Sequence, residues 1–261
     1  MAVRFYSCYA FDLDGTLYRG NEVVPGAREA VESLEASGAK ILYVTNNSGM
    51  MRREYCEKLA KFGFSTSENQ IITSGLVAAH FCLQNSLLKV FVVGEPGLVG
   101  TLREQNIEVV NSDDNGRLNI EVDGAQAVVS GICRDALSYK LLDAAMQVAI
   151  RKETYVACNT DLTYPVENGK FNPGSGAIVA AIEACSGVKA IVVGKPQPTI
   201  LLDPLRKLGI DPRDTLMVGD RMDTDIACGV AVGADTCLVL TGVIREAVEG
   251  QWCLDSVKDL V

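Results

Sequence analysis

Four short polar clusters carry the residues that could do chemistry, and each directly follows an apolar run typical of a β-strand. In an open α/β sheet, ligands bind at the carboxyl ends of the parallel strands. Four separate strands would therefore bring their polar ends into one crevice, and this convergence indicates a functional site more strongly than any single cluster does. The clusters are Asp12–Thr16, Thr45–Ser48, Gly194–Pro196 and Gly219–Asp225.

The acids of the first and last clusters predict a site for a hard cation. Like charges packed into a small volume stay ionised together only if a cation neutralises them. A set of oxygen ligands without histidine or cysteine favours Mg²⁺, which also keeps waters and a substrate phosphate among its ligands. The predicted metal ligands are Asp12, Asp14, Asp220 and Asp225.

The other polar groups of the clusters predict an anion site beside the cation. Lys195 supplies one positive charge, and Thr45 supplies a hydroxyl group. The backbone amides of Gly15 and Asn46 add neutral donors. With the cation, these groups form a clamp for a phosphate dianion, and one carboxylate is left over to act as a nucleophile.

The reaction that these parts favour is phosphoryl transfer, which needs positioning and charge neutralisation more than elaborate covalent chemistry. A carboxylate can attack phosphorus once Mg²⁺ suppresses its repulsion from the phosphate. Asp14 would protonate the leaving oxygen and then take a proton from the water that hydrolyses the acyl phosphate. General acid/base help of this kind is worth about 10²–10⁴-fold in rate.

Strand-type and helix-type runs alternate along the chain, which predicts an α/β fold with a Rossmann-like, doubly wound parallel sheet covered on both faces. The predicted strands are Cys8–Phe11, Ile41–Thr45, Gln70–Thr73, Val90–Val93, Ala127–Ser130, Tyr155–Cys158, Ile191–Val193, Leu216–Val218 and Thr236–Leu240. The predicted helices are Gly26–Ala36, Arg52–Lys61, Gly75–Gln84, Pro96–Glu104, Ser138–Arg151, Gly174–Cys185, Thr199–Lys207 and Thr224–Val232.

The spacing of the clusters predicts where a second α/β domain is inserted. Between Leu17 and Thr45 there is room for only a short flap and one helix. The segment between Ser48 and Lys195 exceeds one or two βα units by about a hundred residues. An inserted domain at this place would exclude water and select the leaving group. We predict a core of residues 1–80 and 174–261 and an inserted domain of residues 81–173.

In their order along the chain, the four clusters resemble motifs I to IV of the haloacid dehalogenase superfamily. More narrowly, the chain resembles the NagD-type branch of that superfamily, which carries a C2 cap domain inserted after motif II. That branch includes sugar-phosphate, nucleotide, phosphoglycolate and 4-nitrophenyl phosphatases. The narrower resemblance rests on Asp14–Gly20, Pro25–Ala27, Thr45–Ser48, Gly174–Ile178, Val193–Pro196 and Gly219–Ile226.

The resemblance implies a role for each residue of the site. Asp12 would be the nucleophile and Asp14 the acid/base, with Thr45 and Lys195 as phosphate ligands. The protein would be a Mg²⁺-dependent phosphatase that acts on a small phosphorylated metabolite. The implied ligands of Mg²⁺ are Asp12, the backbone carbonyl of Asp14, and Asp220, with Asp225 in support.

Four residues outside these roles leave alternatives open. Asn159 and Asp161 fall in a stretch that resembles the specificity segment of the family, and a turn held by Asx hydrogen bonds explains them equally well. Arg221 suits a loop ion pair better than a substrate contact. Cys133 stands where relatives often have aspartate, which weakens any transfer of substrate contacts from the cap.

Two other functions remain open at this stage. A phosphomutase would keep the four motifs but would return the phosphoryl group to a sugar, and phosphomutases of this superfamily usually carry an early lid that this chain lacks. A non-catalytic phosphate-binding relative would have lost one of the motif acids, and none is lost.

The composition narrows the classes of partner and chemistry. The formal net charge of −9 argues against a nucleic-acid or anionic-membrane partner, because both need a basic surface. No apolar run approaches the roughly 20 residues needed to cross a bilayer, so we expect a cytoplasmic protein. The nine cysteines form no CxxC pair, and His80 is the only histidine, which disfavours Cys–His, Ser–His–Asp and zinc chemistry. A homodimer through the inserted domain stays open.

Overall fold

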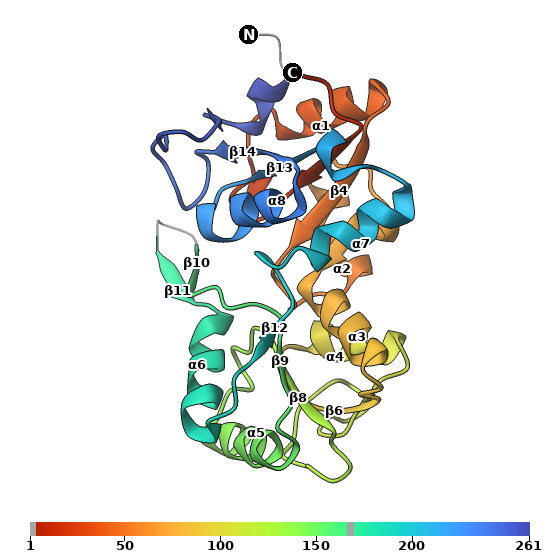
Figure 1. Ribbon diagram of the computed structural model, residues 1–261, viewed down its shortest axis with the longest axis vertical. Helices are drawn as coiled ribbons and strands as arrows, with labels where there is room; N and C mark the ends of the chain where they lie inside the picture. The colour runs from red at the N-terminus through yellow and green to blue at the C-terminus, as the bar shows by residue number, and fades with distance from the viewer. Residues whose placement is uncertain (1–3, 166–169) are drawn as a thin grey trace.

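The computed structural model describes residues 4–165 and 170–261. Its described part contains two parallel sheets, which lie one above the other in Figure 1 with both chain ends beside the upper sheet. No helix in the described ranges is long and apolar enough to span a membrane.

The first sheet has six parallel strands in the order β15-β14-β13-β1-β4-β5. Its first strand in sequence lies inside the sheet, and the chain adds strands on both sides of it. This order confirms the predicted doubly wound α/β class. The strands are β1 (Cys8–Phe11), β4 (Lys40–Thr45), β5 (Ile71–Thr73), β13 (Thr215–Gly219), β14 (Asp235–Val239) and β15 (Cys253–Leu254).

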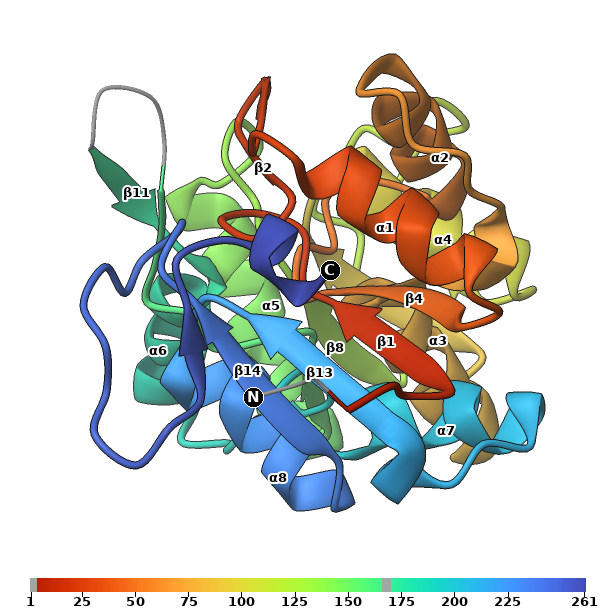
Figure 2. The same ribbon diagram turned by 90° about the horizontal axis from the view of Figure 1, so that it is seen from above.

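Helices cover both faces of the first sheet, as Figure 2 shows. On β1, Tyr9 and Phe11 belong to one apolar cluster with helices α1 and α2, whereas Cys8 and Ala10 belong to another with α7 and α8. This alternation follows from the two-residue period of a strand, and it buries the strand on both faces. The four helices are α1 (Ala27–Ala36), α2 (Arg52–Lys61), α7 (Thr199–Leu208) and α8 (Ala227–Val232).

The second sheet has five parallel strands in the order β12-β9-β8-β6-β7. Helices α5 and α6 pack on one face of it, and α3 and α4 pack on the other. The strands are β6 (Lys89–Val93), β7 (Glu108–Val109), β8 (Ala127–Ser130), β9 (Tyr155–Ala157) and β12 (Ile191–Val192). The helices are α3 (Ser74–Gln84), α4 (Pro96–Glu104), α5 (Tyr139–Lys152) and α6 (Ser175–Ser186).

One apolar cluster joins the two sheets. It contains Ala10 and Leu42 from the first sheet, Val92 and Val129 from the second, and Leu201 from α7. Separating the two sheets would expose this shared apolar core to water, so the sheets are packed together.

The strand pairing extends the second sheet beyond the boundary predicted at residue 173. The predicted core includes residues 174–261, but β12 pairs with β9, and α6 packs against α5. β12 is a two-residue edge strand, and its apolar pattern carries no information about which sheet it joins. We propose that the inserted domain continues to about Val192, while its predicted start at residue 81 stays a prediction.

The strands that the sequence patterns did not predict are all short, and they include the edge strands β7 and β15. Two antiparallel hairpins of two and three residues per strand are too short to show a period. They are β2 (Tyr18–Arg19) with β3 (Glu22–Val23), and β10 (Thr163–Pro165) with β11 (Phe171–Pro173). Within residues 4–165 and 170–261, the 3₁₀ turns are Glu68–Gln70, Pro212–Asp214 and Val257–Leu260.

A buried side chain completes the backbone hydrogen bonding beside β6. Asn111 is fully buried, and its Oδ1 accepts the N–H of Val92 at 2.8 Å. Its Nδ2 donates to the carbonyl of Val92 at 2.9 Å. The side chain therefore replaces a strand neighbour that β7 is too short to supply.

We expect Asn111→Ala to lower the free energy of unfolding by about 1–3 kcal/mol, because it leaves both polar groups of Val92 buried without partners. Urea unfolding measures the change. Asn115→Ala, at an exposed position four residues on, is the matched control and should change the midpoint little. Equal midpoints for the two variants would contradict this account of Asn111.

Candidate active site

Three neighbouring strands of the first sheet deliver side chains to one edge. Asp12 follows β1, Thr45 ends β4, and Asp220 follows β13. The register pairs Phe11 with both Tyr43 and Val218, so the ends of the three strands lie at the same level. The predicted convergence at the carboxyl ends of the strands is therefore present for three of the four clusters. The fourth, Gly194–Pro196, follows β12 of the second sheet and reaches the site from there.

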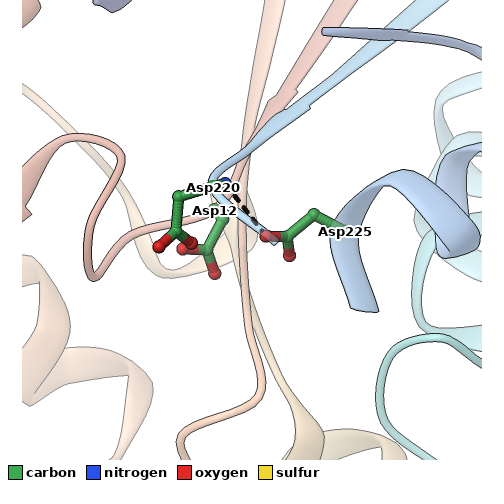
Figure 3. A group of neighbouring side chains, drawn as sticks. All are labelled: Asp12, Asp220 and Asp225. Carbon is green, nitrogen blue, oxygen red and sulfur yellow. Dashed lines mark hydrogen bonds between the residues drawn. The ribbon is translucent and has the colours of Figure 1, made fainter. Parts of the chain in front are cut away.

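A cluster of three acids forms at this edge. One carboxylate oxygen from each of Asp12, Asp220 and Asp225 lies within 4.8 Å of the other two, and all three residues are buried. Figure 3 shows Asp12 and Asp220 side by side and Asp225 approaching from the helical side. Asp225 belongs to a π-helical turn, Met222–Ile226, which directly precedes α8. Such a buried, oxygen-only set fits a divalent cation.

The electrostatics of the cluster agree with that fit. Burial raises the pKa of Asp12 well above its ordinary value, Lys195 opposes this, and the charges of Asp225 and Asp220 add to it. Burial, followed by the charge of Asp225, raises the pKa of Asp220 to about 7. Both shifts have the cause expected when carboxylates share a dry site without enough positive charge.

Lys195 brings a buried positive charge into the cluster. Its Nζ donates to Asp12 Oδ1 at 2.6 Å, to Asp225 Oδ1 at 2.6 Å and to the carbonyl of Val44 at 2.9 Å. Burial opposes the charged form, but the two carboxylates outweigh it and hold the pKa of Lys195 above its ordinary value. The ammonium therefore stays charged and fixes the position of Asp12.

Asp14 is partly exposed, whereas Asp12 is buried. Burial raises the pKa of Asp14, against the opposing charge of Lys58 and a 3.4 Å hydrogen bond from the hydroxyl of Tyr18. A raised pKa favours the protonated acid, which is the form needed to donate a proton. The side chains of Asp12 and Asp14 both face a cavity of about 610 Å³.

Comparison with known proteins identifies the relationship. The family model described as haloacid dehalogenase-like hydrolase matches residues 9–108, and the related HAD-hydrolase-like model matches residues 192–260. The chain is 34% identical over 244 residues to the 5'-nucleotidase YutF of Bacillus subtilis (strain 168), which covers 93% of this chain and 90% of that one. The chain belongs to the haloacid dehalogenase-like hydrolases.

A solved structure described as a putative nagD protein superposes with a TM-score of 0.86 at 28% identity, covering 98% of this chain and 97% of that one, and it places the chain in the NagD-type branch of this family. The chain is 35% identical over 239 residues to an acid sugar phosphatase of Staphylococcus aureus (strain MRSA252), covering 91% of this chain and 88% of that one. The p-nitrophenyl phosphatase from Archaeoglobus fulgidus superposes with a TM-score of 0.87 at 33% identity and 98% coverage of both chains. The glycerol phosphate phosphatase Rv1692 from Mycobacterium tuberculosis, in complex with magnesium, gives a TM-score of 0.85 at 28% identity, covering 98% of this chain and 77% of that one.

In this NagD-type phosphatase, the side chain of Asn46, at the end of β4, holds the backbone of Lys195 in place. Its Oδ1 accepts the N–H of Lys195 at 2.7 Å, and its Nδ2 donates to the carbonyl of Lys195 at 3.0 Å and to Asp161 Oδ1 at 3.1 Å. The Asn46 side chain thus joins the first sheet to two segments that leave the second sheet. Its predicted role, phosphate binding through the backbone amide, stays a prediction.

Gly15 has a different role from the one predicted for it. Its N–H donates to the carbonyl of Tyr18 at 2.7 Å, so this amide is engaged in a tight turn and is not free for a phosphate. Its φ of 94° is in the left-handed region, and a Cβ atom there would lie 2.5 Å from Asp220 Oδ2. Glycine is therefore required because Asp220 packs directly against the backbone of this turn.

Asn159 and Asp161 lie at the cavity in an Asx turn. Asn159 Oδ1 accepts the N–H of Asp161 at 3.1 Å, and its Nδ2 donates to the carbonyl of Asn46 at 2.7 Å. Both polar atoms of the buried Asn159 take part in these bonds, as the turn alternative describes. The amide keeps a second N–H, Asn159 lines the cavity, and its role as a substrate ligand stays a prediction. Asp161 lines the cavity, where burial raises its pKa against the charge of Arg221, and it stays a predicted ligand.

The structure shows what Arg221 and Cys133 contact. Arg221 lines the cavity, but its guanidinium pairs with Asp223 at 3.2 Å and donates to the carbonyl of Thr163 at 3.3 Å. Cys133 is buried in the apolar cluster of the inserted domain. The pair of Arg221 with Asp223 is a loop ion pair of the kind that the sequence favoured over a substrate contact.

Several residues that line the cavity lie away from the strand ends and were missed for that reason. Lys58 is on α2, and its only signal is helical spacing, since it lies three residues after the buried Tyr55 and one before the buried Leu59. The inserted domain adds Arg134 and Tyr164. These positions depend on how the two sheets face each other, which strand-end motifs do not predict.

We expect Asn46→Ala to lower kcat by about 10²-fold, because Lys195 loses the hydrogen bonds that fix its backbone and a misplacement near 1 Å has that effect. Steady-state kinetics with 4-nitrophenyl phosphate measure the change. The exposed variant Asn115→Ala is the control. An Asn46→Ala enzyme with unaltered kcat would show that Asp12 and Asp225 alone position the lysine.

Proposed function

We propose that this phosphatase hydrolyses a small phosphomonoester through an aspartyl-phosphate on Asp12, with Mg²⁺ as its cofactor. The observation that carries the proposal is the contact of Lys195 with Asp12 and Asp225, inside the cluster that Asp220 completes. Residues from distant parts of the chain meet there at hydrogen-bonding distance. A buried arrangement of this kind serves charge neutralisation at a transferring phosphoryl group.

The cation would be held by Asp12, Asp220 and the backbone carbonyl of Asp14, with Asp225 in support. Mg²⁺ suits this set because the cluster offers only oxygen ligands and leaves room for waters and a phosphate oxygen. When bound, it offsets the repulsion between the carboxylates and the phosphate. Asp225 also accepts the N–H groups of Asp220 and Arg221 at 3.1 Å each, which orients the loop that carries Asp220.

In the first step, the free carboxylate oxygen of Asp12 attacks phosphorus while the ammonium of Lys195 holds the other oxygen. The bond from phosphorus to the leaving oxygen breaks, and Asp14 gives its proton to that oxygen. The products of this step are the alcohol and an acyl phosphate on Asp12. Lys195 and Thr45 are the proposed ligands of the phosphoryl oxygens.

In the second step, Asp14 acts as the base. It takes a proton from a water molecule, whose oxygen attacks phosphorus and releases Asp12 as a carboxylate with inorganic phosphate as product. Asp14 ends protonated, as it began. The same side chain can serve in both directions because its pKa is raised by burial toward the working range.

The substrate class is a small metabolite bearing one phosphate ester. The relatives are named as a 5'-nucleotidase, an acid sugar phosphatase, a p-nitrophenyl phosphatase and a glycerol phosphate phosphatase, and the phosphate esters in these names differ in the leaving group. A cavity of about 610 Å³ has the size of a small-molecule site. A homodimer through the inserted domain stays a prediction.

We expect Asp12→Asn to abolish phosphate release from 4-nitrophenyl phosphate, because the amide cannot act as the nucleophile. The wild-type enzyme should turn over with Mg²⁺ and stop with EDTA, and added Mg²⁺ should restore it. Near-ultraviolet circular dichroism controls for folding of the variant. Near-normal turnover by Asp12→Asn, or by the wild type in EDTA, would refute the proposal.

We expect Asp14→Asn to slow kcat by at least about 10²-fold, since the acid/base is lost. The loss should be greater for glycerol phosphate than for 4-nitrophenyl phosphate, because an alkoxide needs the proton more than a nitrophenolate does. Tyr18→Phe, which removes only the hydrogen bond to Asp14, should cost much less. Equal losses for both substrates would mean that Asp14 acts through something other than leaving-group protonation.

A further inference from the structure

Lys58 places a positive charge at the wall of the catalytic cavity, outside the predicted phosphate site. Its Nζ lies 3.9 Å from the centroid of the Tyr18 ring and 5.9 Å from that of Phe62. The side chain is half-buried and reaches the cavity from α2, a helix of the first sheet. The aromatic rings hold the stem and ammonium in place.

This ammonium differs from the other cations of the cavity in having no carboxylate within ion-pair distance among the described residues. Lys195 is held by two aspartates. Arg134 pairs with Glu95 at 3.3 Å, and Arg221 pairs with Asp223 at 3.2 Å. Lys58 therefore retains the capacity to bind an anion in the cavity.

Lys58 lies on the side of the cavity where the leaving group must be. The Tyr18 ring under its ammonium carries the hydroxyl that donates to Asp14 at 3.4 Å. Because Asp14 must reach the leaving oxygen, the atoms beyond that oxygen extend from Asp14 into the space that Lys58 borders. Lys58 and Met50 also line an adjoining hollow of about 470 Å³, so this side has room for a substituent.

We propose that Lys58 is a specificity-determining residue that binds an anionic group, a carboxylate or a second phosphate, on the leaving group of the substrate. The inference rests on the proposed phosphatase function and narrows its substrate class. A charge-assisted hydrogen bond from a half-buried ammonium favours such substrates over esters whose leaving group is neutral.

Three small substrates test the proposal: ethyl phosphate, 2-phosphoglycolate and ethylene glycol bisphosphate. The wild type should show a higher kcat/KM for at least one of the two anionic esters than for ethyl phosphate. In Lys58→Met, the ratio of kcat/KM for the preferred anionic ester to that for ethyl phosphate should fall by about 10–100-fold, the range for a hydrogen bond to a charged group. Lys58→Arg should recover part of the ratio.

Lys61→Met is the matched control. Lys61 is an exposed lysine one helical turn on, and it lines the adjoining hollow but not the catalytic cavity. This variant should keep the wild-type ratio. The two anionic esters show which anion Lys58 binds. If the kcat/KM ratio in Lys58→Met falls only for 2-phosphoglycolate, the anion is a carboxylate, and if it falls only for ethylene glycol bisphosphate, the anion is a phosphate.

Two results would overturn the inference while leaving the phosphatase function intact. One is a wild type with no preference for either anionic ester. The other is an equal fall for all three substrates in Lys58→Met, which would show that the lysine acts on Asp14 instead. Failure of the proposed function has a separate sign, namely no phosphate release by the wild type from 4-nitrophenyl phosphate with Mg²⁺.

Discussion

The buried ammonium of Lys195 between Asp12 and Asp225 is the contact on which the rest of the site depends. With Asp220, three carboxylates share the site with one ammonium. Fully ionised, they leave an excess of two negative charges, which a divalent cation would balance. Burying charges costs solvation free energy, which is offset only if the charged groups are held in good hydrogen-bonding geometry. Asn46 and the backbone donors around the cluster hold them in this way.

The same contact links the second sheet to the acid cluster of the first. Lys195 follows β12, which belongs to the second sheet, whereas Asp12 follows a strand of the first. The Asn46 side chain binds Lys195 and Asp161 together, and one apolar cluster continues from sheet to sheet. Moving the second sheet would therefore move Lys195 away from Asp12.

The two ends of the cavity differ in burial and in the elements that supply their side chains. The end that holds Asp12, Asp220 and Asp225 is buried and densely hydrogen-bonded, which suits a phosphate group common to all substrates. The other end is lined by half-exposed side chains such as Lys58 and Arg134, from different domains. A common phosphate end and a variable leaving-group end would let relatives share one reaction and act on esters with different leaving groups.

Sequence alone determined the fold class and the phosphatase class. The meeting of Asp12, Thr45 and Asp220 was predictable because each stands at the end of an apolar strand, and a strand end has a defined place in a parallel sheet. Lys195 reaches them from β12 of the second sheet and Asp225 from a π-helical turn, and strand ends alone predict neither position. Tertiary structure alone decided that β12 joins the second sheet, that the Gly15 amide is used by Tyr18, and that Lys58 faces the cavity. These features depend on pairing and packing between segments far apart in the chain, and no local pattern of residue types encodes them.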